Sequence, residues 1–354
     1  QKENIIDKNL SLREVYNQYL HPAVLNTKDQ RLWDALSNGE VLDVFQFSTG
    51  VGLDAAKTIK PQNPTQLTSA NCLMRLMGEK GKERPLDRYC RLKNDMSLWY
   101  KEVQDRGLTQ EEIKILEPYY LPNFGVPASQ EDLMLVCMDK QIAHFTLKEA
   151  NSARKIVAKK DIKKVPELKE KFLEQCPNEI FGQYVWETVM EPQMSYSFAK
   201  PHGLAYSFVG IQTLYLATNF PSVFWNCACL IVKAGGAELL NLDVNDEDEE
   251  ENEKKKNKNA NYGKISTAIG ECITRNIQVL PPDINKSQLI FYPDIKTNSI
   301  IYGLKGLSRI GDNIIIQIMQ NRPYNSIVDF LSKVKVNNCL LYTSPSPRDA
   351  HESR

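Results

Sequence analysis

The chain has 354 residues, of which 42% are hydrophobic and 25% are charged, as is typical of a globular protein. This length predicts two or three packed units, each large enough to bury its own core. Because the formal net charge is zero, any contact with nucleic acid must come from a local basic surface and not from the overall balance. The longest apolar runs are shorter than the roughly 20 residues that a membrane span needs, so we expect no transmembrane helix.

The N-terminal stretch, QKENIIDKNL, has neither the apolar core of a signal peptide nor an initiator methionine. We therefore expect a cytoplasmic chain that is the middle of a longer protein.

The eight cysteines of the chain are scattered, and the one-residue gap between Cys227 and Cys229 matches no zinc pattern. We expect reduced cysteines in the core and no metal ligands.

Signals for helix starts recur through the first part of the chain. A hydroxyl residue followed three positions later by Glu or Gln fits a capping box, in which two free amides at a helix start are satisfied. This spacing begins at Ser11, Thr27, Thr109 and Thr146. Asn38-Gly39 and Pro118 predict helix ends. Because strand alternation is scarce before residue 275, the fold class predicted is mainly α, with residues 1–236 forming a helical domain.

A low-complexity segment, residues 237–261, separates this domain from the rest of the chain. An acidic run is followed by lysines (NLDVNDEDEEENEKKKNKNAN), and such a composition favours a solvated linker. The alternative, an acidic metal site, is less favoured because nothing apolar holds the carboxylates together. We expect a second, smaller domain at 262–338. Residues 339–354, CLLYTSPSPRDAHESR, resemble translated sequencing-adaptor sequence and are excluded from the fold.

The segment from Lys148 to Lys171 is basic, because it contains nine basic residues and four acidic ones. On a helix, Lys148, Lys155 and Lys159 form one stripe with Arg154 beside it. The stripe is either a solvated charged face or a cradle for a polyphosphate, in which arginine forks onto oxygens and lysine supplies point charges. The pattern alone leaves both interpretations open.

The motif Lys200-Pro201-His202 precedes a long apolar run. Proline suits the first turn of a helix because its missing amide is not needed there. We therefore predict a helix from about His202 to Asn219. Lys200 and His202 then lie at its positive end, where free amides make an anion site. The alternative is a packed loop with a hydrogen-bonded histidine.

Residues 301–331 predict two helices joined by a tight turn at Gly311. Leu304, Leu307 and Ile310 precede the turn, and an apolar helix follows from Ile314. Amides at the start of the second helix can bind a DNA backbone phosphate without reading sequence, although many such pairs are only structural. The sequence contains no P-loop, no paired-aspartate motif in a strand context that suits two-metal catalysis, no zinc spacing among its histidines and no Ser or Cys nucleophile constellation.

These segments resemble the alpha subunit of bacterial DNA polymerase III, the C-family replicative polymerase. The similar segments follow the family's order over most of residues 40–335. They are VLDVFQFSTGVG (41–52), NFGVPASQEDLMLVC (123–137), ANSARKIVAKK (150–160), SYSFAKPHGLAYSFVGIQTLYLATNFP (195–221), IQVLPPDINKSQLIF (277–291) and 300–331.

The resemblance implies polymerase fingers followed by a helix-hairpin-helix domain. It implies that the incoming nucleotide's triphosphate contacts Arg154, Lys155, Lys159 and Lys160, with Lys200 and His202 nearby. It implies DNA contacts for Lys305, Arg309, Gly311 and Asn313. The catalytic aspartates and their Mg²⁺ belong to a palm expected upstream, so we expect this fragment to be inactive alone. The partners implied are dNTP, primer-template DNA and, for the full-length protein, a sliding clamp and other replisome subunits, with no membrane.

The chain departs from the family pattern at three places. Arg75-Leu76-Met77 stands where the family has Arg-Pro-Gly, and Lys155 replaces an arginine, which removes a planar fork. Arg309 replaces a glycine, which weakens a phosphate nest but adds a positive charge. The alternative function is a non-catalytic DNA-binding protein that uses only the helix-hairpin-helix unit; a palm with paired aspartates upstream would favour the polymerase.

Overall fold

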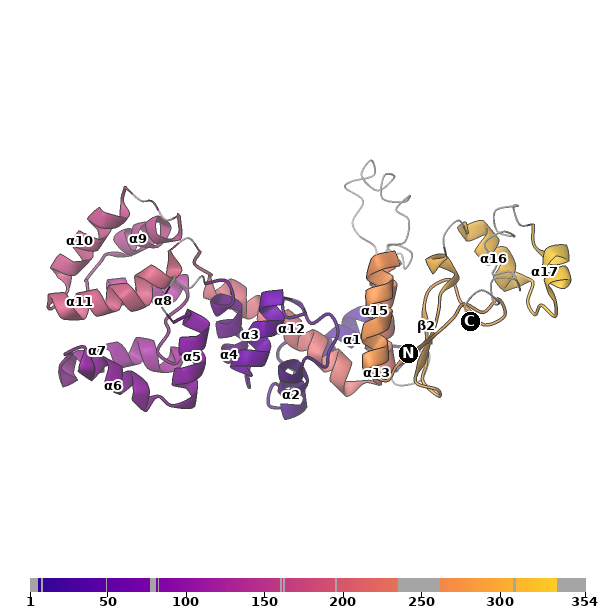
Figure 1. Ribbon diagram of the computed structural model, residues 1–354, viewed down its shortest axis with the longest axis horizontal. Coiled ribbons are helices and arrows are strands. Elements are labelled where there is room, and N and C mark those ends of the chain that lie inside the picture. Colours follow the sequence, from indigo (N-terminus) through magenta and orange to yellow (C-terminus); the bar gives the residue numbers. More distant parts are fainter. Residues whose placement is uncertain are drawn as a thin grey trace. The chain divides into compact units, whose positions relative to one another are not determined.

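The computed structural model describes residues 6–7, 9–48, 50–76, 81, 83–159, 161, 163–194, 196–234, 262–307 and 310–335 (Figure 1). The predicted linker at 237–261 and the tail at 339–354 lie outside them. By its internal contacts the chain divides into two compact units, Gln1–Thr218 and Asn219–Arg354. This division assigns the helix Ser222–Lys233 to the second unit, whereas the sequence pattern places it in the first domain.

The named elements of the first unit are all helices in its described residues, with one isolated β-bridge between Ser129 and Phe198, and the mainly α fold class is as predicted. Short π and 3-10 segments (labelled η) continue several of its helices. The elements are α1 Leu12–Val15, η1 Tyr16–Leu20, α2 Gln30–Asn38, α3 Gly50–Ile59, α4 Pro64–Leu73, α5 Pro85–Asn94, α6 Ser97–Asp105, α7 Gln110–Tyr120, η2 Leu121–Asn123, α8 Gln130–Met138, α9 Leu147–Lys159, α10 Val165–Gln175, α11 Glu179–Val185, η3 Trp186–Met190, η4 Glu191–Gln193 and α12 Lys200–Asn219.

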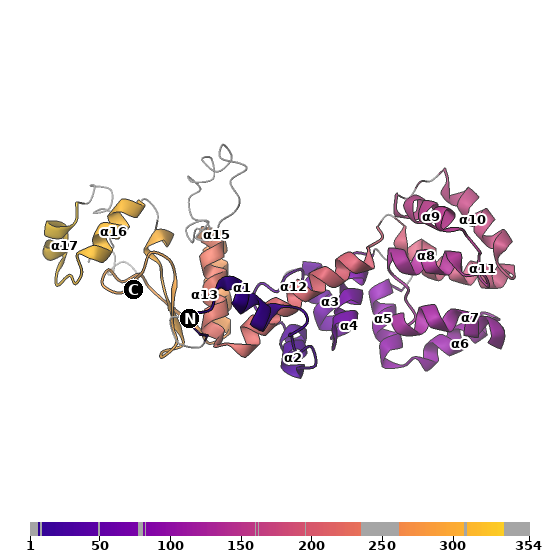
Figure 2. The ribbon, with the colours of Figure 1, turned by 180° about the vertical axis from the view of Figure 1, so that it is seen from behind.

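Two hydrophobic cores hold this unit together. One lies among α6 to α11 and η3 and buries Trp99, Phe172 and Trp186. The other lies among α2, α3, α4 and α12 and buries Trp33 and Ile211. Each fully buried large side chain contributes about 1.5–3 kcal/mol to folding. Both views show α12 running beside α3 and α4, and its first residues lie near α8 (Figures 1 and 2).

The predicted helix ends are confirmed in part. Capping boxes form at Ser11, Thr109 and Thr146, and Gly39 ends α2 in the left-handed conformation (φ 70°). The box predicted at Thr27 is wrong. Asp29 caps α2 instead, because its carboxylate accepts from the amide and the guanidinium of Arg31.

The helix end predicted at Pro118 is also wrong. Helix α7 continues through Pro118 to Tyr120. A proline removes only one amide donor, and Leu116 and Tyr120 on either side of it are fully buried. Their burial holds the last turn helical.

The second unit combines helices with a small sheet. Its described elements are α13 Ser222–Lys233, α15 Tyr262–Thr274, β1 Gln278–Leu280, β2 Tyr292–Asp294, β3 Ser299–Ile301, η6 Leu304–Gly306, α16 Asp312–Gln320 and α17 Ile327–Lys333. The strand order is β1-β3-β2, with β1 parallel and β2 antiparallel to β3. Ser299 pairs with Gln278 on one side and with Asp294 on the other. Helices α13 and α15 pack on this sheet through Cys227, Ala268 and Ile300.

In the structure, the first half of the helical hairpin differs from the prediction. In the described residues before Gly311, one 3-10 turn, Leu304–Gly306, stands where a helix is predicted, and Leu307 is already extended. The second helix begins at Asp312, two residues earlier than predicted. Gly311 precedes it with φ −77° and ψ 156°, a conformation open to any residue, so the turn does not depend on glycine for its backbone.

None of the described helices is long and apolar enough to cross a membrane.

Candidate nucleotide and DNA-binding sites

The first turn of α8 is fixed by a capping box that the sequence analysis did not single out. Ser129 Oγ accepts from the amide of Asp132 at 3.1 Å, and the Asp132 carboxylate accepts from the amide of Ser129 at 3.0 Å. Both residues are buried. The Ser-x-x-Asp spacing in the sequence is the signal that locates this helix start. Three consecutive polar residues, Gln130 to Asp132, are thereby held in the first turn.

Gln130 joins α9 to the segment that precedes α12. Its Oε1 accepts from Arg154 Nη1 at 2.6 Å, and its Nε2 donates to the Ser197 carbonyl at 2.6 Å. The backbone amide of Gln130 also donates to the Phe198 carbonyl at 3.0 Å. The side chain and the backbone of one residue therefore fix Arg154 relative to the start of α12.

Arg154 is half-buried and is held by neutral groups. Besides Gln130, the guanidinium has one other hydrogen-bond partner among the described residues, Asn151, to which Nε donates at 3.2 Å and Nη2 at 2.8 Å. Within the described residues it makes no ion pair. Because amide oxygens carry no net charge, the positive charge of Arg154 is not neutralised by its partners.

Lys200 is the first residue of α12, which begins two residues before the predicted position. Its amide donates to the Glu131 carboxylate at 2.7 Å, and its Nζ lies 3.3 Å from Asp132 Oδ1. The prediction that amides at this helix start are free is therefore wrong for Lys200, because Glu131 in the neighbouring helix reaches it. The Lys200 side chain is 41% exposed, whereas that of Asp132 is 10% exposed.

His202 is exposed on the first turn of α12. Its ring centroid lies 5.3 Å from that of Phe198 and 3.9 Å from that of Tyr206. Within the described residues its imidazole packs against these rings and forms no hydrogen bond. A packed loop with a hydrogen-bonded histidine, the alternative in the sequence analysis, is therefore wrong.

The remaining basic residues of the predicted triphosphate site are less constrained. Lys155 and Lys159 lie on α9 with Arg154, as predicted, and both are exposed. Neither makes an ion pair with a described residue. Lys160 lies outside the described residues. The structure thus brings Arg154 and Lys200 together through α8 and leaves Lys155 and Lys159 on the solvent side of α9.

A second arginine, absent from the predicted site, lies near the same segment. Arg75 follows α4, and its Cζ is 5.8 Å from the ring centroid of Tyr196 and 5.5 Å from that of Phe198. Its Nη2 donates to Gln46 Oε1 at 2.8 Å. The sequence shows Arg75 only as part of a departure from a family motif, and nothing in local periodicity predicts these contacts.

Cys72 lies in α4 close to the acidic residues of α8. Burial raises the pKa of its thiol to about 12, and Asp132 adds to this rise. The thiol is therefore protonated near neutral pH and is not a nucleophile at this site. No disulfide joins the described cysteines, and most of them are buried, as expected from the sequence.

The predicted DNA-binding residues are gathered around the start of α16. Gly311 is the residue before the helix, and Asn313 is exposed in its first turn. Lys305 Nζ donates to the Asp312 carboxylate, so an acidic side chain at the helix start neutralises this lysine. Arg309 lies outside the described residues.

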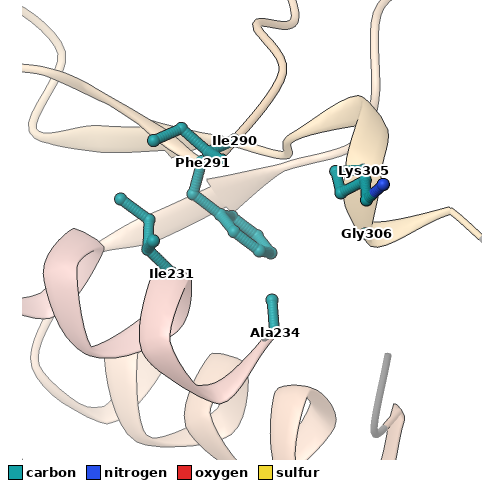
Figure 3. A pocket seen from close by; sticks show the side chains of 6 residues that line it. All are labelled: Ile231, Ala234, Ile290, Phe291, Lys305 and Gly306. Atoms are coloured by element: carbon teal, nitrogen blue, oxygen red, sulfur yellow. The ribbon is translucent and has the colours of Figure 1, made fainter. Parts of the chain in front are cut away.

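A small recess in the second unit is lined by side chains of α13, of the loop before β2 and of η6 (Figure 3). Ile231, Ala234, Ile290 and Phe291 form its apolar part, and Lys305 lies at its side. Lys305 is the one titratable residue among the described residues that line the recess, and the Lys305 ammonium group is paired with Asp312. The recess therefore holds no set of groups suited to catalysis.

The comparisons with known proteins agree with this architecture. The model of the bacterial DNA polymerase III alpha subunit finger domain matches residues 3–179, half of the chain. A helix-hairpin-helix motif matches residues 276–341. The fold and its helical site thus define polymerase fingers followed by a helix-hairpin-helix region. The chain belongs to the bacterial DNA polymerase III alpha subunit family.

Curated relatives extend the similarity over nearly the whole chain. It is 40% identical over 337 residues, 94% of its length, to "Probable DNA polymerase YorL" of Bacillus subtilis and to the DNA-directed DNA polymerase of Bacillus phage SPbeta. It is 26% identical over 317 residues, 88% of its length, to the DNA polymerase III subunit alpha of Treponema pallidum. These matches cover 25%, 25% and 23% of the relatives, so the chain spans about a quarter of their length.

Proposed function

We propose that this chain is the fingers and helix-hairpin-helix part of a DNA-directed DNA polymerase that acts in DNA replication. The fingers bind the phosphates of an incoming dNTP, and the second unit contacts the backbone of primer-template DNA. The observation that carries the proposal is Arg154, whose half-buried side chain is held, among the described residues, by the neutral amides of Gln130 and Asn151. The names of the curated relatives support a polymerase role.

The chemistry of the site suits a polyphosphate. A guanidinium donates two parallel hydrogen bonds to phosphate oxygens, and Arg154 has no carboxylate to compete with them in the described part of the chain. The Lys200 ammonium is 41% exposed and is held by a single acidic side chain, so a more highly charged phosphate can compete for it. Lys155 and Lys159, exposed on α9, add positive potential without fixed contacts.

Bond formation belongs to the rest of the polymerase. The described residues do not suit a Mg²⁺ site, because they contain no group of three or more His, Cys, Asp or Glu side chains that could hold a metal ion. We assign Mg²⁺ and the catalytic aspartates to a palm in the full-length protein. The part of this chain is to bind, orient and neutralise the triphosphate, and we expect no polymerisation by the fragment alone.

The second unit supplies the proposed DNA contact. Among the described residues, a Cβ added to Gly311 would meet no atom within 4 Å, which leaves room there for a phosphate of the DNA backbone. Asn313 lies exposed beside it. Lys305 contributes only when it leaves Asp312. A replicative role also implies a cytoplasmic location and contacts with a sliding clamp and other replisome subunits by the full-length protein.

Calorimetric titration of the whole chain with dATP tests the nucleotide part of this proposal, with deoxyadenosine as the matched ligand that lacks phosphates. We expect dATP to bind and deoxyadenosine not to bind, and we expect Arg154→Met to weaken dATP binding. A chain that binds duplex DNA but no dATP would instead support the alternative, a non-catalytic DNA-binding protein.

A further inference from the structure

Arg75 contacts a residue that the proposed nucleotide site also contacts. Its guanidinium lies over the ring of Phe198, and the ring of His202 packs against the same phenylalanine. The carbonyl of Phe198 accepts from the amide of Gln130, the residue that holds Arg154. One short segment, 196–202, is therefore in contact with Arg75 and, through Gln130, with Arg154.

The two arginines are held in the same manner. A glutamine from a neighbouring element accepts from each of them, Gln46 from Arg75 at 2.8 Å and Gln130 from Arg154 at 2.6 Å. Like Arg154, Arg75 makes no ion pair within the described residues. Neutral acceptors orient both guanidinium groups and leave both positive charges available to an anion.

The loop that carries Gln46 is tightly placed. Gln46 has a φ of 68°, and its carbonyl lies against the start of α3. A Cβ added to Gly52 would come within 2.0 Å of that carbonyl oxygen, so only glycine allows this approach. The backbone of Gln46 is therefore held in place, and its side chain accepts from Arg75 from that position.

The hydrogen bonding of Arg75 is incomplete. Of its three side-chain nitrogens, only Nη2 has an acceptor among the described residues, and Nε is buried without one. A buried donor on a charged group is unfavourable when it has no partner. Stacking on Tyr196 and Phe198 compensates part of the charge but supplies no hydrogen-bond acceptor.

We propose that Arg75 is a second phosphate-binding arginine of the nucleotide site, which binds the polyphosphate of the nucleotide together with Arg154. This inference rests on the proposed function. Arg75 Nη1 has no acceptor among the described residues and can donate to a phosphate oxygen, and a second guanidinium suits the several phosphoryl groups of a nucleoside triphosphate. The aromatic rings of Tyr196 and Phe198 keep the guanidinium plane in place while its edge binds the anion.

Calorimetric titration of the whole chain with dATP, and separately with inorganic tripolyphosphate, tests this assignment. Arg75→Met keeps the apolar stem and removes the charge, Arg154→Met does the same at the first arginine, and Arg13→Met changes an exposed arginine of α1 as a control. We expect Arg75→Met to lower the affinity for both ligands about tenfold, which corresponds to the loss of one hydrogen bond from a charged group. Arg13→Met should leave both affinities unchanged.

The outcomes separate this inference from the proposed function. If Arg154→Met abolishes binding while Arg75→Met leaves it unchanged, the role of Arg75 is wrong and the nucleotide site stands. A loss confined to dATP, with tripolyphosphate unaffected, also overturns the role, because Arg75 would then act on the base. If the wild-type chain binds neither ligand, the proposed function fails and this inference with it.

A variant that does not fold does not block the test. If Arg75→Met loses its helical circular dichroism, Arg75→Lys decides, because it keeps the charge and the stem but loses the planar fork. A folded Arg75→Lys chain whose tripolyphosphate affinity falls severalfold supports the proposal. A folded Arg75→Lys chain with wild-type affinity overturns it.

Discussion

Gln130 and Arg154 are joined by a 2.6 Å hydrogen bond between Oε1 and Nη1, and the other end of the same amide donates to the Ser197 carbonyl. One neutral side chain thus spans α8, α9 and the segment before α12. An acidic residue at position 130 would hold Arg154 more strongly but would neutralise it. The amide fixes the arginine and leaves its charge for a ligand.

Replacing Gln130 by Leu should therefore impair binding more than folding. The variant loses the acceptor for Arg154 and the donor to Ser197, so the arginine is free to move. We expect dATP affinity to fall about tenfold, which corresponds to about 1.4 kcal/mol. Calorimetry measures the affinity, and circular dichroism measures the melting temperature. Gln141→Leu, at an exposed position in the same unit, is the control. Unchanged affinity in Gln130→Leu would show that Arg154 does not need this partner.

Arg154 itself should matter for catalysis once the chain is joined to a palm. In such an enzyme we expect Arg154→Ala to lower kcat/KM for every dNTP. The loss should correspond to about 1.5–3 kcal/mol of transition-state stabilisation, the contribution of a hydrogen bond to a charged group. Steady-state primer extension with each nucleotide in turn measures this loss. If kcat/KM equals that of the wild type for all four nucleotides, the basic stripe on α9 is a solvated charged face and does not bind the triphosphate.

The ion pair between Glu149 and Lys171 should make stability depend on pH in the acidic range. Hydrogen bonds from Lys171 and Thr146 lower the pKa of Glu149 from 4.5 to about 2 in the folded chain. A lowered pKa means that the carboxylate stabilises the fold above the unfolded value of 4.5, and that this contribution is lost as the pH falls toward 2.

Thermal melts of Glu149→Gln across this range test the point. We expect the variant to melt below the wild type at pH 7 and the difference to shrink as the pH falls from 4.5 toward 2. A difference that stays constant down to the acid limit would mean that Glu149 is not ionised in a stabilising pair.

Binding of duplex DNA by the whole chain should be independent of sequence and strongly weakened by salt, because backbone contacts release counterions. Asp312→Asn should tighten it by about 0.3–1 kcal/mol, since this change frees Lys305 and removes a negative charge from the start of α16. Titration of two unrelated labelled duplexes at two salt concentrations measures both effects, with Asp294→Asn on the sheet as the control. Binding of only one duplex, or weaker binding by Asp312→Asn, would argue against the backbone contact.

The helices were largely predictable because their signals are local. Capping boxes at Ser11, Thr109 and Thr146 act within one turn, and the left-handed Gly39 ends its own helix. Local signals failed where a neighbour supplied a competing interaction. Asp29 accepts from the amide of Arg31, so α2 begins after Asp29 and not after Thr27. The burial of Tyr120 keeps α7 helical past Pro118.

The candidate site was predictable only in its basic residues. Arg154 and Lys200 are visible as charges in the sequence, but their partners come from α8, and no spacing along the chain relates residue 130 to residue 154 or residue 200. Arg75 is further removed, since its contacts with Tyr196 and Phe198 join elements more than a hundred residues apart. Such contacts depend on tertiary packing, which periodicity does not encode.

The most direct test of the account is the effect of dATP on the melting temperature of the whole chain, in the wild type and in Lys200→Ala. A ligand that binds only the folded state raises this temperature. We predict a rise with millimolar dATP in the wild type, and the loss of most of it in Lys200→Ala. Without ligand the variant should keep near-native stability, because Lys200 is 41% exposed and Asp132 retains its bonds to Ser129. A variant that unfolds outright, or one that keeps the full rise, would contradict a nucleotide site at the start of α12.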